Sequence, residues 1–163
     1  MAIFFNTRTE THPEFRTTSA HSITLGDEQW PTVEHYVLAQ RFECKNLQAE
    51  VRSAPYAFEA KALARQHPNA LRNDWEKIRD DVMETAIREK FKQHPRLQHK
   101  LAATEGQELI EASACSNYWG AGSNGTGKNK LGRILMKIRD ELRNSFKAYG
   151  RAPSGVATEN RLG

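Results

Sequence analysis

The chain has 163 residues, of which 38% are hydrophobic and 27% are charged, and its formal net charge is +4 at pH 7. This length and composition fit one soluble globular domain with its own core. With no apolar run long enough to cross a bilayer, no signal-peptide pattern and only two cysteines, the chain is expected to be cytoplasmic, without a membrane partner or disulfide framework. The small basic excess is interspersed with acidic residues, unlike the concentrated basic face of a dedicated nucleic-acid binder.

Short strands and a first helix are predicted near the N-terminus. Residues 3–5 and 22–25 are the candidate strands, and Gly26-Asp27 supplies a turn after the second. Thr32 is a good N-cap residue, and apolar residues at helical spacing carry the predicted helix to Phe42.

Two shorter helical pieces are predicted next. One follows a break near Lys45-Asn46. Ser53 is the candidate N-cap of the other, which runs to about Gln66 and ends before Pro68.

Longer amphipathic helices dominate the second half. Asn73 or Asp74 caps the first of them, Pro95 breaks or restarts it, and its apolar stripe is Trp75, Ile78, Val82, Met83, Ala86, Ile87 and Phe91. A short strand is centred on Leu109-Ile110. A final helix ends near Gly150, and its apolar positions are Leu131, Ile134, Leu135, Ile138, Leu142 and Phe146. We predict a mainly α domain with a few short β-strands over residues 1–148, and a flexible C-terminal tail over residues 149–163.

A glycine-rich loop precedes the final helix. Glycines let the backbone approach a ligand closely, and a helix N-terminus offers unpaired N–H groups with a partial positive charge. The loop therefore predicts an anion cradle, with Trp119 beside it to cover a base or sugar. The residues of this predicted cradle are Gly120, Gly122, Gly127, Lys128 and Asn129.

Motifs along most of the chain resemble the NADAR, or YbiA-like, family. The first is WPTVEHY, residues 30–36, followed by Ala39, Gln40 and Phe42. The later matches are Glu59-Ala60-Lys61, Arg65, Arg72, Asp74-Trp75, Met83, Lys90-Phe91, Gln93, Pro95, Leu97, Leu109, Glu111, Trp119-Gly120, Gly122, Gly127, Asn129, Leu131-Gly132, Leu135-Met136 and Arg139. They follow the family's order and spacing across roughly residues 3–145.

The resemblance implies a mostly helical, YbiA-like single domain that hydrolyses N-glycosidic bonds on ribose without a cofactor. Family members look like N-glycosidases of phosphoribosylamino-pyrimidine riboflavin intermediates, or like hydrolases that remove ADP-ribose from nucleobases, including guanine in DNA. We therefore expect a small phosphoribosyl or ADP-ribosyl substrate, with ADP-ribosylated nucleic acid as the alternative partner. The six histidines are scattered without metal-ligand spacing, so no metal is predicted.

The chain also departs from the family pattern. Residues 16–18 read Arg-Thr-Thr where Ser-Asn-Phe usually follows Phe15, and Leu38 stands where a Gln is frequent. Ser116 replaces the Asp that commonly lies before the aromatic–Trp–Gly unit. The changes at residues 16–18 and 116 remove an amide and a carboxylate from the expected pocket. They raise a second hypothesis, a non-catalytic binder of ADP-ribose or a related nucleotide.

Glu34 and His35 are the candidate catalytic residues. Breaking a ribosyl C–N bond develops positive charge on the sugar. A nearby carboxylate can stabilise that charge or orient the attacking water. Glu34 lies in the first turn of a predicted helix, where its alternative role is a favourable contact with the helix dipole. The resemblance favours catalysis. His35 is a proton relay or else a surface or core histidine. Glu111 is a second acid or, as we favour, an acceptor that holds the loop.

The remaining candidates bind the substrate. Trp30 lies beside Glu34 in the sequence, and Trp119 either stacks on a base or plugs the loop. Lys61 holds phosphate or belongs to an exposed basic face. Arg133 reaches the same phosphate as the loop or faces solvent, and Arg72 positions the pocket or pairs with a neighbouring acid.

Overall fold

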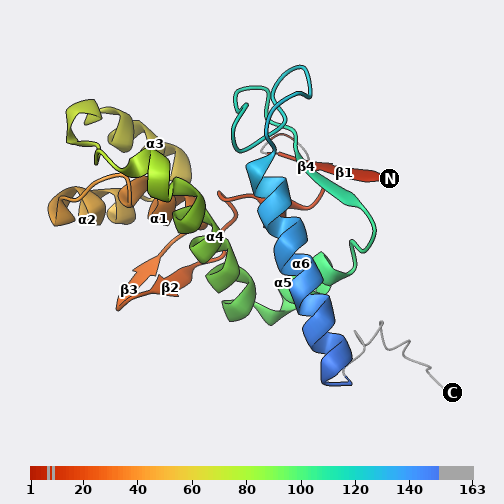
Figure 1. Cartoon of the computed structure of the whole chain (residues 1–163). Coiled ribbons are helices and arrows are strands. Elements are labelled where there is room, and N and C mark those ends of the chain that lie inside the picture. The colour runs from red at the N-terminus through yellow and green to blue at the C-terminus, as the bar shows by residue number, and fades with distance from the viewer. Residues whose placement is uncertain (7, 9, 151–163) are drawn as a thin grey trace, which may run out of the picture.

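The computed structural model describes residues 1–6, 8 and 10–150, and helices dominate them (Figure 1). Three of these helices form one group: α1 (Val33–Ala39), α2 (Lys45–Ser53) and α3 (Ala57–Arg65). The long helix α4 (Trp75–Gln93) contacts both α1 and α6 (Lys130–Ala148), while α5 (Pro95–Ala102) packs on α4 and α6. The predicted mainly α architecture is therefore confirmed, with α4 as the element that joins its two sides.

The strands are short and form separate pairs. β1 (Ala2–Phe5) runs parallel to β4 (Glu108–Glu111), so the first residues of the chain lie beside residues a hundred positions later. β2 (Ile23–Leu25) and β3 (Glu28–Trp30) form an antiparallel hairpin around Gly26, whose φ of 62° suits glycine. β1, β2 and β4 were predicted. β3 was not, because its first two residues are polar and exposed.

The first helix begins where its cap was predicted. The Thr32 hydroxyl accepts a hydrogen bond from the His35 backbone N–H at 3.2 Å. The helix is shorter than predicted, because Phe42 leaves it and forms an isolated antiparallel bridge with Leu71. That bridge ties the end of α1 to the segment before α4.

The predicted boundary at Ser53 was wrong. Ser53 is the last residue of α2 rather than the cap of the next helix, and α3 begins only after Tyr56. Pro55 explains the difference, because a proline disfavours helical backbone in the residue before it. Ala54 is accordingly extended, with ψ of 132°.

The later helices lie close to their predictions. α4 follows Asp74, although that side chain makes no cap hydrogen bond, and Pro95 opens α5. α6 ends at Ala148, two residues before the predicted position. The predicted tail, apart from residues 149 and 150, lies outside the described residues.

The core joins both helical sides and includes the charged side chain of Lys90 among its apolar residues. The largest fully buried side chains include Phe5, Phe15, Phe42, Phe91 and Lys90. Across the described ranges, no helix is both long and apolar enough to cross a membrane.

Candidate active site

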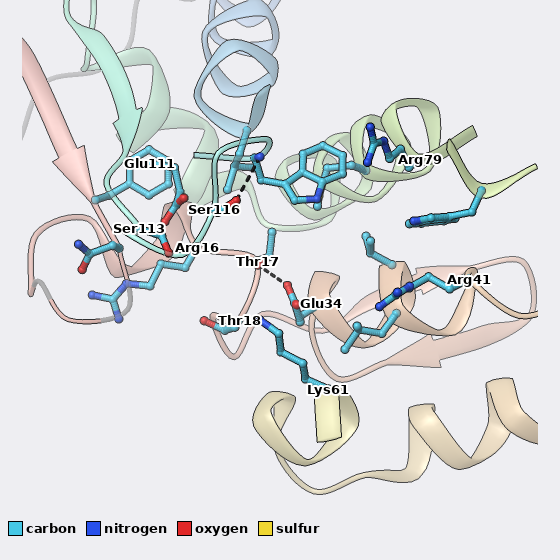
Figure 2. Close-up of a pocket in the computed structure, with 18 of the residues that line it drawn as sticks. Arg16, Thr17, Thr18, Glu34, Arg41, Lys61, Arg79, Glu111, Ser113 and Ser116 are labelled. Atoms are coloured by element: carbon cyan, nitrogen blue, oxygen red, sulfur yellow. Dashed lines mark hydrogen bonds between the residues drawn. The ribbon is translucent and has the colours of Figure 1, made fainter. Parts of the chain in front are cut away.

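A cavity of about 480 Å³ opens between the α1–α3 side of the molecule and the side built from β4 and α6 (Figure 2). Its polar lining comes from the N-terminal segment, α1, α3, α4 and the residues after β4. The principal polar residues are Arg16, Thr17, Thr18, Glu34, Arg41, Lys61, Arg79, Glu111, Ser113 and Ser116. Its apolar lining includes Phe5, Leu38, Met83 and Trp119. Carboxyl, cationic and aromatic groups thus meet on one hollow.

Glu34 faces this cavity from the first turn of α1. Its carboxylate accepts a hydrogen bond of 2.6 Å from the Thr17 hydroxyl, drawn in Figure 2, and its backbone N–H donates to the Thr17 carbonyl at 2.9 Å. Thr17 therefore fixes both the backbone and the side chain of Glu34. The helix N-terminus also favours a negative charge at this position.

Glu111 brings a second carboxyl group to the cavity from the end of β4. Burial raises the pKa of Glu111 to about 7, and the negative charge of Glu34 acts in the same direction. A backbone hydrogen bond from Ser113 and the charge of Lys61 act against this increase. Near neutral pH, Glu111 is therefore protonated in a substantial fraction of molecules. An acid of this kind beside a second carboxylate is the arrangement that cleaves glycosidic bonds.

Gly120 makes room for Glu111. A Cβ atom on Gly120 would overlap the Glu111 carboxyl group and lie 2.7 Å from the Glu111 carbonyl oxygen. Gly127 packs equally closely on the backbone of Gly120 and Ala121, and Gly122 has a φ of 72°. These glycines allow chain segments to pack against one another, which differs from the predicted contact with an anion.

The predicted anion cradle is not formed, because the N–H groups at the start of α6 already have partners. Lys128 N–H donates to the Asn117 carbonyl at 2.8 Å, and Asn129 N–H donates to the Gly120 carbonyl at 3.0 Å. The next two amides, of residues 130 and 131, donate to the carbonyls of residues 118 and 119. Few N–H groups remain there to bind phosphate.

Asn129 joins the loop to β4. Its side-chain oxygen accepts from the Glu111 N–H at 3.0 Å, and its side-chain nitrogen donates to the Leu109 carbonyl at 2.9 Å. The amide thus pairs with the strand as a neighbouring peptide group would. Asn129 is buried and is not among the residues that line the cavity.

The remaining cradle residues and the separate candidate Arg133 also lie outside the cavity. Lys128 is exposed, with its ammonium nitrogen 5.2 Å from the centre of the Tyr118 ring. Arg133 is exposed on α6, one turn beyond the loop. Neither side chain lines the cavity, and Gly122 and Gly127 do not line it either. From this region, the structure brings Trp119, but not the loop glycines, to the site.

His35 does not reach the cavity, which corrects its predicted role as a proton relay. The side chain is fully buried, with Nδ1 2.8 Å from the Thr32 hydroxyl and Nε2 3.0 Å from the Ala54 carbonyl oxygen. Burial lowers the pKa of His35. A carbonyl can only accept, so Nε2 carries the proton and Nδ1 accepts from Thr32 in the neutral ring. His35 therefore ties α1 to the end of α2.

Trp30 and Arg72 also serve the surrounding structure rather than the cavity lining. Trp30 is buried, packs edge-on against Tyr36, and lies under the Arg52 guanidinium group at 5.5 Å. Arg72 forms two hydrogen bonds with Asp74, at 2.6 and 3.0 Å. Of the alternatives for Arg72, pairing with a neighbouring acid is the one that the structure contains.

Arg41 and Arg79 were not predicted as site residues. The Nε atom of Arg41 is buried without a hydrogen-bond partner among the described residues. The Arg79 guanidinium lies 3.5 Å from the centre of the Tyr118 ring and forms a 2.7 Å ion pair with Glu76. With Lys61, which reaches the cavity from α3, they place cations in the lining beside its carboxyl groups (Figure 2).

A periodic signal for these cations was present in the sequence. The cavity-lining residues of the α1 region, Glu34, Val37, Leu38 and Arg41, follow the i, i+3, i+4, i+7 spacing of one helix face. Arg79 lies four residues after Trp75 on α4, within a stripe that was interpreted as core. A helix face can therefore be core along part of its length and site along the rest.

Ser116 explains one departure from the family pattern. Its hydroxyl oxygen accepts a hydrogen bond from the Trp119 backbone N–H at 3.2 Å, marked by a dashed line in Figure 2, and another from the Gly120 N–H at 3.2 Å. The position needs an acceptor that holds this turn, and serine supplies one without a charge. Trp119 is thereby placed at the cavity wall.

The comparisons with known proteins agree with this architecture. The NADAR domain family matches residues 3–143. N-glycosidase YbiA of Escherichia coli is 36% identical over 140 residues, covering 86% of this chain and 88% of that protein. An N-glycosidase of Nostoc punctiforme is 35% identical over 153 residues, covering 92% and 98%. The chain therefore belongs to the NADAR family, and its class is that of hydrolases acting on N-glycosyl bonds.

Two further relatives extend the comparison. The solution structure of Escherichia coli YbiA superimposes with a TM-score of 0.79 at 31% identity, covering 99% of this chain and 94% of that one, so the fold is YbiA-like. A riboflavin biosynthesis protein of Vibrio vulnificus is 42% identical over 140 residues, which are 86% of this chain and 38% of that protein.

Proposed function

We propose that the protein hydrolyses the N-glycosidic bond of a phosphoribosylated nucleobase-like compound, such as a phosphoribosylamino-pyrimidine intermediate of riboflavin synthesis. The observation that carries this proposal is the presence of Glu34 and Glu111, in unlike environments, on one cavity beside basic side chains. The cavity volume of about 480 Å³ is in the range of small-molecule sites. The name of the Vibrio vulnificus relative points to the same pathway.

The proposed reaction uses the carboxyl groups differently. Glu111 donates its proton to the departing nitrogen as the bond between this nitrogen and the anomeric carbon breaks. The Glu34 carboxylate stabilises the positive charge on the ribose and takes a proton from the attacking water. The water oxygen forms the new bond to the anomeric carbon. One water is consumed, and a ribose phosphate and a free amine or base are released.

The other lining residues are assigned to binding. Lys61 and Arg41 hold the phosphate, because cations on the cavity wall match its charge. Trp119 covers the departing ring, a contact worth about 1–3 kcal/mol for a nucleobase. Thr17 keeps the Glu34 carboxylate directed at the sugar.

A second candidate is an ADP-ribosyl glycohydrolase that releases ADP-ribose from guanine in nucleic acid. The observation in its favour is that Arg16 and Arg79 line the cavity in addition to Lys61 and Arg41. Such a set of cations suits a diphosphate better than a single phosphate. The bond broken is again a C–N bond at the anomeric carbon of ribose.

Product analysis distinguishes the candidates. Purified protein is incubated with a phosphoribosylamino-pyrimidine or with ADP-ribosylated guanosine, and released base is separated by chromatography. Release from the first compound supports the main proposal, and release from the second alone supports the alternative. Calorimetric binding of ADP-ribose without turnover of either compound would contradict both and support the non-catalytic binder.

A further inference from the structure

Lys90 is a titratable side chain in the core, where burial lowers its pKa to about 7, and the proposed chemistry does not use it. It lies on α4 and is 1% exposed. Its ammonium group donates to the Glu14 carbonyl at 2.6 Å, the Arg16 carbonyl at 2.8 Å and the Ser19 hydroxyl at 2.5 Å. Burying an ammonium group is costly, and these acceptors compensate for the water that it loses.

The acceptors all belong to residues 14–19, which we call the N-terminal clamp segment. Beyond the short 3-10 turn Pro13–Phe15, this segment has no regular secondary structure. It nevertheless presents Arg16, Thr17 and Thr18 to the cavity. Its position therefore depends on side-chain contacts with other elements. Its own Phe15 is buried in the core against Phe5 and Phe91, and Lys90 reaches its backbone from α4.

We propose that Lys90 is a positioning residue: by binding the Arg16 carbonyl before Thr17 and the Ser19 hydroxyl after it, it holds Thr17 where its hydroxyl and carbonyl engage Glu34. The proposal rests on the proposed function for its effect on turnover, but not for its effect on the segment. Lys90 does not line the cavity, so it acts through Thr17 rather than on the substrate.

The surroundings of Lys90 are consistent with an anchor. The Ser19 hydroxyl also lies 3.1 Å from Nδ1 of His21, whose ring packs edge-on against His94. The Glu14 carboxylate lies 3.3 Å from His12 and 3.5 Å from the Lys100 ammonium nitrogen. Glu14 and Ser19, the two end residues of the segment, thus have side-chain partners of their own in addition to Lys90.

The chain contains a matched control. Arg139 is also a buried cation, 7% exposed, that donates to backbone carbonyls, of Thr104 at 3.0 Å and Gln107 at 2.6 Å. These carbonyls precede β4, and none of the three residues lines the cavity. Arg139→Met therefore removes the same kind of interaction away from the site.

The first measurement is hydrogen exchange at the Glu34 amide. In the first turn of α1 this N–H has no partner within the helix, and it donates to the Thr17 carbonyl instead. We expect Lys90→Met to accelerate exchange at Glu34 at least about tenfold more than it accelerates exchange in α6. In Arg139→Met, exchange at Glu34 should not be accelerated more than exchange in α6. Unchanged protection at Glu34 in Lys90→Met would overturn the proposal.

The second measurement is turnover of whichever substrate the wild-type protein hydrolyses. We expect kcat of Lys90→Met to fall about 10- to 100-fold with KM changed less, since misplacing a catalytic group costs this much. Arg139→Met should stay within about twofold at a temperature where both variants are folded. Equal losses of kcat in the two variants would contradict a positioning role. If the wild type hydrolyses neither substrate, the proposed function fails while the exchange experiment still decides this inference.

A milder variant covers the case in which Lys90→Met does not fold. Ser19→Ala removes one acceptor but keeps the ammonium group and its backbone partners. We expect faster exchange at Glu34 and a reduced kcat, in the same direction and smaller. A folded Ser19→Ala protein with wild-type values for both would overturn the proposal.

Discussion

The N-terminal clamp segment and the glycine-rich loop after β4 both border the cavity without regular structure, but they are held in different ways. The loop is fixed mainly by its own backbone hydrogen bonds and by Asn129. The clamp segment is fixed by side chains: its own Phe15 is buried in the core, and Lys90 of α4 binds its backbone carbonyls. The loop has the more conspicuous composition, yet its amides serve the structure, whereas the plainer segment contacts the candidate catalytic carboxylate. Composition thus identified an important loop without identifying its role.

The largest effect is expected at the carboxylate that the clamp segment holds. Glu34→Gln keeps the shape of the side chain but removes the charge that stabilises the ribosyl cation and accepts the proton. We expect kcat to fall about 10²- to 10⁴-fold, with little change in thermal stability, in an assay of base release. Glu50→Gln is the control, because Glu50 is exposed on α2. Turnover retained in Glu34→Gln would show that the carboxylate contacted by the clamp segment is not catalytic.

The next effect tests whether the loop is structural. Asn129→Ala leaves the Glu111 N–H and the Leu109 carbonyl without their side-chain partner. We expect the free energy of unfolding to fall by about 2–4 kcal/mol, measured by urea denaturation, since each unsatisfied group costs about 1–3 kcal/mol. A variant that unfolds like the wild type but loses ligand affinity would restore the anion-binding interpretation of this loop.

Glu111 packs against Gly120 of the loop and lines the cavity together with Thr17 of the clamp segment. Its raised pKa leads us to expect a pH-dependent activity. Because burial raises its pKa to about 7, the protonated acid is lost as pH rises through 7, and kcat should then fall about tenfold per unit. The contribution of Glu111 to the free energy of unfolding should also decrease as pH rises, between its ordinary pKa of 4.5 and its raised pKa of about 7. Glu111→Gln should abolish this limb of the pH–kcat profile; a limb that survives in Glu111→Gln belongs to another group.

The smallest effect is expected at Lys128. Its side chain is exposed above the Tyr118 ring and does not line the cavity. Lys128→Ala should change ligand affinity less than about twofold and stability by less than about 0.5 kcal/mol. Lys61→Ala is the informative partner variant, because Lys61 does line the cavity and should weaken phosphate binding in calorimetry. A large loss at Lys128 would show that the loop approaches the ligand.

The features that could be predicted from the sequence are those that depend on residues close together in the chain. The Thr32 cap and the restart of the helix at Pro95 depend on local chemistry, and both were found. The contact of Thr17 with Glu34 joins irregular backbone to a helix seventeen residues later, and no local rule contains it. The error at His35 was avoidable, because adjacent residues of a helix point about 100° apart. If Glu34 faces the cavity together with Leu38 and Arg41, His35 lies off that face.

Asn129 has a consequence beyond the site. β4 pairs with β1 along one edge, and along the other its Leu109 carbonyl and Glu111 N–H are occupied by the Asn129 amide, while the Glu111 carbonyl receives the Ala121 N–H. An exposed strand edge is a template on which a second molecule can add its own strand. A single side chain and one loop amide thus occupy this edge of β4, so a second molecule cannot add a strand to it.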